Sequence, residues 1–124
     1  MDNIFPDSEK LYRAVFPESY AKMYWRRDGS VSSAAFKDED GLSVERGDFR
    51  SDETVIEDMK NFFKGCIVSI TVEQCKNVEA AVKYKPTKRS IYHTEIHGSE
   101  EVALLNPGQR KKLASAAKME YYEK

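Results

Sequence analysis

Residues 52–72 read DETVIEDMKNFFKGCIVSITV, in which a helical pattern is followed directly by a strand pattern. The apolar positions of the first half lie at i, i+1, i+4, i+7 and i+8, which is one face of an α-helix. Acidic residues fill the first turns, where they complement the helix dipole, and Ser51 or Asp52 can cap the start. Gly65 is the residue type expected just after the end. We therefore predict a helix over 52–64.

The run from Cys66 to Val72 is rich in β-branched residues and follows that glycine, which predicts a buried central strand. Residues 31–36 and 42–45, joined by an acidic turn that ends in Gly41, are expected to form a hairpin. A short helix is expected over 18–25. Alternating or apolar stretches elsewhere predict further strands, at 11–16, 78–84 and 90–97.

Two further helix starts carry capping signals. Thr71 is placed to cap a single helical turn over 72–77. Asn106 is a favoured N-cap, and Pro107 suits the first helical position because its missing N–H costs nothing there. Gln109 completes the pattern of a capping box. We predict a helix that runs from Pro107 into the C-terminal tail.

These elements predict an α+β fold in a single domain over residues 1–124. We expect a mostly antiparallel sheet of four to six strands, with one face covered by the 52–64 helix. The C-terminal helix is expected to pack at an edge of the sheet or to be partly free. The expected core residues are Phe36, Leu42, Val44, Phe62, Phe63, Ile67, Val68 and Ile70.

The formal net charge is −1, so no strong overall field attracts or repels nucleic acid. The charge is uneven, because residues 37–58 hold nine acidic and three basic residues whereas residues 76–124 hold ten basic and six acidic ones. Only two cysteines occur, which favours a reducing, cytoplasmic compartment. The N-terminus does not resemble a secretory leader, and no apolar run approaches the roughly 20 residues of a membrane span. No membrane segment is therefore expected.

The segment from Tyr92 to His97 is the richest in residue types that bind metals or transfer protons. On a strand, His93, Glu95 and His97 point to one face. Such a row can bind a divalent metal, or it can supply a base with a carboxylate that orients it. The alternative is an ordinary solvated face of a sheet. No metal site is predicted, because three ligands on one strand suit tetrahedral zinc poorly.

Basic residues supply a second group of candidates. Arg13, between apolar neighbours on a predicted strand, is either an outward-facing residue or a guanidinium that holds a phosphate or carboxylate. Two basic patches suggest contact with phosphate groups, and the simpler alternative is that their side chains are only solvated. The candidate binding residues are Lys88, Arg89, Arg110, Lys111 and Lys112.

The order of an Arg, a Ser on a second strand and a Glu on a later strand is similar to the Arg-Ser-Glu arrangement of ADP-ribosyltransferase-type domains. That resemblance implies that Arg13 and Ser33 hold a nicotinamide dinucleotide and that Glu95 orients its ribose. The chain departs from the pattern two residues before Glu95, where such domains carry Glu or Gln and this sequence has His93. Three stretches also resemble small bacterial proteins of no assigned activity: Leu11-Tyr12-Arg13, Ser32 to Asp38 with Gly41 to Val44, and His93 to Ile96.

Two functions from different classes fit these observations. The first is a small cytoplasmic binding module, of a bacterium or its mobile elements, that engages a protein partner or nucleic acid. It is favoured because no P-loop, glycine-rich dinucleotide fingerprint or serine-hydrolase elbow is present, and no cofactor is predicted. The second is a small enzyme that acts on a nucleotide or nucleic acid. Its catalytic residues, expected to converge in one cleft, are Arg13, Ser33, His93 and Glu95.

Overall fold

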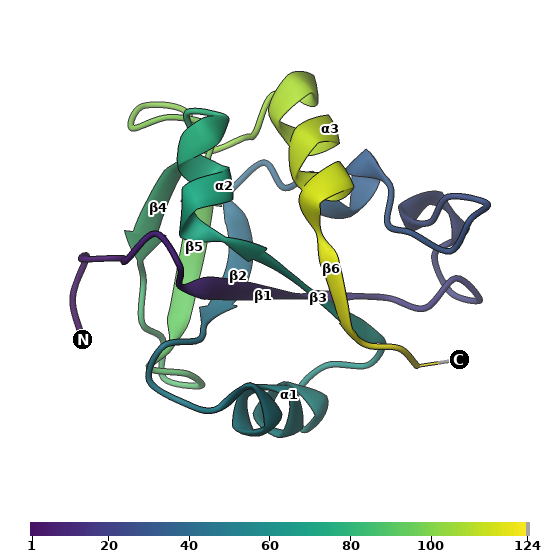
Figure 1. Ribbon diagram of the computed structural model, residues 1–124, viewed down its shortest axis with the longest axis horizontal. Coiled ribbons are helices and arrows are strands. Elements are labelled where there is room, and N and C mark those ends of the chain that lie inside the picture. The colour runs from purple at the N-terminus through teal and green to yellow at the C-terminus, as the bar shows by residue number, and fades with distance from the viewer. Residues whose placement is uncertain (124) are drawn as a thin grey trace.

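A computed structural model describes residues 1–123, whose six strands form one antiparallel sheet in the order β4-β5-β2-β1-β3-β6 (Figure 1). The predicted α+β class, with a sheet of four to six strands, is confirmed. The strands are β1 (Lys10–Val15), β2 (Leu42–Arg46), β3 (Cys66–Thr71), β4 (Ala81–Tyr84), β5 (His93–His97) and β6 (Lys118–Tyr121).

Helices cover both faces of this sheet. One face carries α1, and the opposite face carries α2 and α3 (Figure 1). The short 3₁₀ helix η2 packs against α3 on that second face. The helical elements are η1 (Lys22–Tyr24), η2 (Ser33–Phe36), α1 (Asp52–Lys60), α2 (Val72–Asn77) and α3 (Pro107–Ala116).

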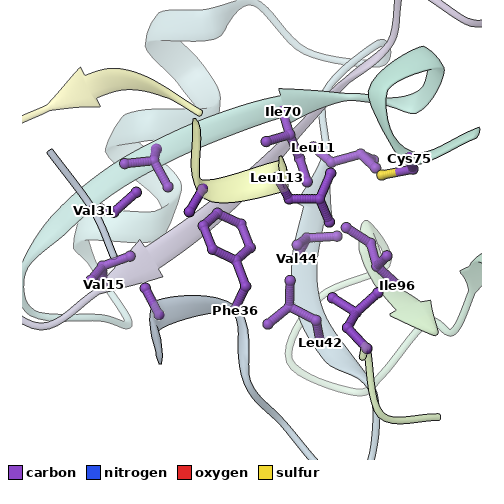
Figure 2. Packing of buried hydrophobic residues seen from close by; sticks show 14 of the residues in the cluster. Leu11, Val15, Val31, Phe36, Leu42, Val44, Ile70, Cys75, Ile96 and Leu113 are labelled. Atoms are coloured by element: carbon purple, nitrogen blue, oxygen red, sulfur yellow. The ribbon is translucent and has the colours of Figure 1, made fainter. Parts of the chain in front are cut away.

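The larger core lies between the sheet and the layer of α2, α3 and η2 (Figure 2). Alternate residues of β1, β2 and β3 contribute to it, as the two-residue period of a strand requires. In β5, Thr94 and Ile96 are fully buried, whereas His93, Glu95 and His97 are only partly so. The main buried side chains are Leu11, Val15, Phe36, Leu42, Val44, Val68, Ile70, Ile96, Leu105 and Leu113.

A smaller core lies under α1. Val55 and Met59 of the helix pack on Tyr12 and Ile67 of the sheet. The expectation that Phe62 and Phe63 are core residues is wrong, because α1 ends at Lys60 instead of continuing to residue 64. Phe62 therefore falls in the turn after the helix and is 57% exposed, and Phe63 is only partly buried.

The predicted hairpin of residues 31–36 with 42–45 is also wrong. Residues 33–36 form η2, and β2 pairs instead with β1 and β5. The predicted helix over 18–25 is reduced to the single turn η1. These segments are short, so contacts with distant strands decide their conformation.

The capping signals predicted the other helices correctly. Thr71 and Gln74 form a capping box at the start of α2. Asn106 and Gln109 form another at the start of α3, which has Pro107 in its first turn. However, α3 ends at Ala116 and lies across a face of the sheet, not at its edge. The tail after it forms β6, which pairs with β3.

A buried ion pair joins the N-terminal segment to β2. Arg46 and Glu9 are 1% and 0% exposed, and two nitrogens of the guanidinium donate to the two carboxylate oxygens at 3.0 and 2.9 Å. Two further donors of Arg46 bind the main-chain carbonyls of Asp2 and Ile4. The ring of Phe5 lies 4.1 Å from the guanidinium carbon. This single side chain thus fixes the N-terminal segment to β2.

Gly65 is required by its surroundings as well as by its backbone. Its φ is +120°, and a Cβ there would lie 2.3 Å from the carbonyl oxygen of Val15. We expect Gly65→Ala to lower the free energy of unfolding by about 1–2 kcal/mol for the left-handed backbone and by about 1–3 kcal/mol more for the clash. Gly29→Ala is the control, because Gly29 has φ +87° but nothing within 4 Å. Urea denaturation measures both, and equal losses would contradict the steric argument.

The two cores share one sheet, so the described residues form one domain. Cys66 and Cys75 are free and buried, and burial raises the pKa of the Cys75 thiol to about 12. Neither thiol is therefore a ready nucleophile. Within residues 1–123, no helix combines the length and the apolar character needed to cross a bilayer.

Candidate functional site

A cavity of about 530 Å³ lies between the C-terminal end of α1 and the sheet, and we call it the α1 cavity. Its floor comes from β1, β2 and β5, which are neighbours in the sheet. One wall is apolar and aromatic, with Met59, Phe62 and Phe63 from α1 and the turn that follows it. Its volume lies within the range of roughly 300–1,000 Å³ that is typical of small-molecule sites.

Arg13 fills a gap at the floor of this cavity. Strands β1 and β2 pair only at Leu11 with Arg46 and at Tyr12 with Glu45, and they separate beyond that point. The Arg13 side chain crosses the gap, and its Nε and Nη1 donate to the carbonyl oxygens of Ala35 (3.3 Å) and Ser43 (3.1 Å).

The charge of Arg13 is not balanced by a direct ion pair within residues 1–123. Burial lowers the pKa of its guanidinium, and the charge of Asp38 acts in the opposite direction. The two hydrogen bonds to carbonyls use two of the five N–H donors of the side chain. A partly buried guanidinium with donors left over is suited to hold a carboxylate or a phosphate.

His93 and Ser43 form a hydrogen-bonded pair on the same floor. His93 Nδ1 lies 2.7 Å from the carbonyl oxygen of Lys85, which can only accept, so Nδ1 carries the hydrogen. Nε2 of the neutral ring is then an acceptor, and Ser43 Oγ at 3.1 Å donates to it. Ser43, the base His93 and the carbonyl of Lys85 that orients the base are thus connected by two hydrogen bonds.

The charged side chains that line the α1 cavity are mostly cationic. Arg13, Lys64 and Arg89 line it, and the guanidinium carbon of Arg89 lies 5.0 Å from the ring centre of Phe63. The lining contains one carboxylate, Glu45, which binds Arg50 at 3.3 Å and accepts from Ser90 Oγ at 2.9 Å. Because Glu45 is already neutralised, the cavity favours an anionic occupant.

Glu95 lies beside the cavity, directly opposite Ser43 in the pairing of β5 with β2. It is outside the cavity lining, and its Oε1 accepts from His97 Nε2 at 2.8 Å. The main chain of Gly41, at φ +103°, covers this pair so closely that a Cβ would lie 2.6 Å from His97 Nε2. Within residues 1–123, no three His, Cys, Asp or Glu side chains are grouped to hold a metal ion.

The four predicted catalytic residues are only partly brought together. Arg13 and His93 line the same cavity, and Glu95 follows His93 on the same face of β5. Ser33 does not join them, because it lies on η2 and outside the cavity lining. Ser43 of β2 occupies the place that was expected for Ser33. The alternation of Leu42, Ser43 and Val44 was the available signal, because it puts Ser43 on the polar face of a strand.

The predicted binding residues lie on two sides of the sheet. Lys88 and Arg89 line a second cavity of about 230 Å³, which shares Phe62, Phe63 and other lining residues with the α1 cavity. Arg110, Lys111 and Lys112 lie on α3, on the opposite side (Figure 1). Arg110 is held by the carbonyl of Leu105 at 2.6 Å. The two basic patches therefore do not form one surface.

The α1 cavity thus combines a guanidinium without a carboxylate partner in the described residues, an aromatic wall and a serine–histidine pair. Such a combination can bind a ligand with a negatively charged group and a flat apolar group, and it can activate a hydroxyl group beside that ligand. No protein-family model, no curated protein and no solved structure matches the chain.

Proposed function

We propose that this domain binds a nicotinamide dinucleotide (NAD⁺) in the α1 cavity and acts on it in the manner of ADP-ribosyltransferase-type domains. The observation that carries the proposal is the placement of Arg13, Ser43 and Glu95 on the three adjacent strands β1, β2 and β5. This is the Arg-Ser-Glu order to which the sequence is similar, with Ser43 in place of Ser33. Strand order alone does not specify a function, so the residues of the cavity have to suit the ligand as well.

The composition of the cavity supports a dinucleotide. The phosphates require a cation, and Arg13 has no carboxylate partner within the described residues. The bases require flat apolar surfaces, which Phe62 and Phe63 supply from one wall. Arg89, which leans over those rings, adds a second guanidinium at the mouth. The second cavity next to the α1 cavity gives room for a ligand with two nucleotide halves.

The position of Glu95 supports a role at the ribose. It lies directly opposite Ser43, so a ribose placed over Ser43 is within reach of its carboxylate. A carboxylate there stabilises the positive charge that develops on the sugar as the bond to nicotinamide breaks. To do so, Glu95 has to release or share its hydrogen bond with His97.

A second candidate is a binding module without turnover. Phe16 and Phe62 line the α1 cavity and are 55% and 57% exposed, and Lys88 and Arg89 lie next to them. Exposed aromatic side chains beside basic ones are typical of surfaces that bind a protein partner or a nucleic acid. This candidate places the same surface in contact with a macromolecule instead of a reacting nucleotide.

Calorimetry with NAD⁺ and chromatography of released nicotinamide test the proposal together. We expect Glu95→Gln to bind NAD⁺ within about threefold of the unmodified protein, because the shape of the side chain is kept. We expect its rate of nicotinamide release to fall by about 100-fold or more, because the charge that stabilises the transition state is lost.

Glu101→Gln is the matched control, since Glu101 is an exposed carboxylate in the loop after β5. An unmodified protein that does not bind NAD⁺ would show the proposal to be wrong. Binding without any release of nicotinamide would favour the module without turnover.

A further inference from the structure

The serine–histidine pair of the α1 cavity has a geometry that binding alone does not require. A hydroxyl that only contacted a ribose would not need a base on its other side. Ser43 has one, because the ring of His93 is held by Lys85 O with the Nε2 lone pair directed at Ser43 Oγ. The pair is also unnecessary to the core, since the flanking residues Leu42 and Val44 are the buried ones.

We infer that Ser43 is the nucleophile of the reaction and receives the ADP-ribosyl group from NAD⁺, with His93 as its general base. This inference rests on the proposed function, because it assumes that NAD⁺ occupies the α1 cavity. It assigns the first acceptor of the ribosyl group to a residue of this chain.

The positions of the charged groups support this assignment. Arg13 Nη1 donates to the main-chain carbonyl of Ser43 itself, so a phosphate on the remaining donors of Arg13 lies close to the Ser43 hydroxyl. Glu95 lies opposite Ser43 on the other side. The three groups come from neighbouring strands: Ser43 and Glu95 lie on the α1 face of the sheet, and Arg13 reaches the gap between β1 and β2 from the face of Leu11 and Val15.

Ser43 Oγ forms a bond to C1′ of the ribose while the bond from C1′ to the pyridinium nitrogen breaks, and its electron pair stays on neutral nicotinamide. The hydroxyl proton moves to His93 Nε2. In a second displacement, a hydroxyl acceptor or water attacks C1′ from the side that nicotinamide left and gives its proton to solvent, while the bond from C1′ to Ser43 Oγ breaks and His93 returns its proton to Ser43 Oγ. No oxidant or reductant is needed.

Two displacements at C1′ retain its configuration, whereas one displacement inverts it. We therefore expect NAD⁺, which has the β configuration, to give β-methyl ADP-riboside when methanol is the acceptor. Proton NMR of the product distinguishes the two anomers. Intact-mass spectrometry and peptide mapping of the protein incubated with NAD⁺ are expected to find ADP-ribose on Ser43.

Three variants test whether Ser43 and His93 act as nucleophile and base or only contact the ligand. Ser43→Ala is expected to lose the adduct and about 100-fold or more in nicotinamide release, at an unchanged melting temperature, because the side chain is exposed. His93→Gln keeps a hydrogen-bonding group but no base, so the rate is expected to fall about 100-fold or more. Ser33→Ala is the control and is expected to change neither quantity, since Ser33 lies outside the cavity.

The α-methyl product, or a Ser43→Ala variant that releases nicotinamide at the unmodified rate, would overturn the inference and leave the proposed function intact. A protein that shows no binding of NAD⁺ by calorimetry would remove the proposed function first, and this inference with it.

Discussion

Replacing Arg46 by Met lowers the free energy of unfolding by about 3–5 kcal/mol. The methionine fills a similar volume but leaves the Glu9 carboxylate, which is 0% exposed, without its cation. It also leaves the main-chain carbonyls of Asp2 and Ile4 without their donors. Urea denaturation at neutral pH, followed by circular dichroism, measures the change.

A double variant, Arg46→Met with Glu9→Leu, tests the physical reason. If the loss comes from an unpaired buried charge, removing both charges restores most of the stability. Lys76→Met is the matched control, because its 2.5 Å ion pair with Asp7 is exposed on both sides. Exposed pairs contribute roughly 0–1 kcal/mol. A loss below about 1 kcal/mol in Arg46→Met would show that the buried pair does not anchor the N-terminal segment.

Replacing Arg13 by Gln raises the Kd for NAD⁺ by about 100-fold or more, which corresponds to about 2.7 kcal/mol. Gln still offers hydrogen-bond donors to the carbonyls of Ala35 and Ser43. It lacks the positive charge of Arg13, which is the only charge at the floor of the α1 cavity without a carboxylate partner within residues 1–123. Arg13→Lys is expected to lose at least about tenfold, because an ammonium cannot reproduce the guanidinium fork. Isothermal titration calorimetry measures both.

Arg110→Gln is the control for net charge. Arg110 lies on α3, on the opposite side of the sheet from the α1 cavity, so its removal changes the overall charge without touching the site. Equal losses of affinity in Arg13→Gln and Arg110→Gln would mean that the ligand responds to net charge alone. An unchanged Kd in Arg13→Gln would show that the phosphates of NAD⁺ do not bind at Arg13.

The sequence was sufficient where structure depends on neighbours along the chain. The capping boxes at Thr71 and Asn106 and the β-branched run after Gly65 predicted their elements correctly, whereas Gly65 misplaced the end of α1 by four residues. Each of these signals acts over a few residues, through side-chain bonds to local main-chain groups or through backbone preference.

The sequence was insufficient where structure depends on distant partners. Residues 31–36 lie close to 42–45 along the chain, which suggested a hairpin, but β2 pairs with strands that begin at Lys10 and His93. The strand β6 was missed because its four residues resemble a continuation of α3 until β3 provides a partner. Phe62 has helical spacing but falls beyond the last turn of α1.

The candidate site shows the same division. Arg13, His93 and Glu95 could be predicted because Arg, His and Glu are residue types that often serve in functional sites, and all three fall on predicted strands. Ser43 was missed in favour of Ser33, because the choice between two serines depends on which strand lies beside β5. That order, β5-β2-β1, follows from pairing across the whole chain and not from local pattern.

Strand β5 carries the core on one face and the candidate site on the other. Ile96 and Thr94 are buried, and His93, Glu95 and His97 alternate with them. A shift by one residue would exchange the two sets, so burial of Ile96 also sets the alignment of His93. Variation in this strand therefore divides by parity: even-numbered positions govern whether the domain folds, and odd-numbered positions govern only the candidate site.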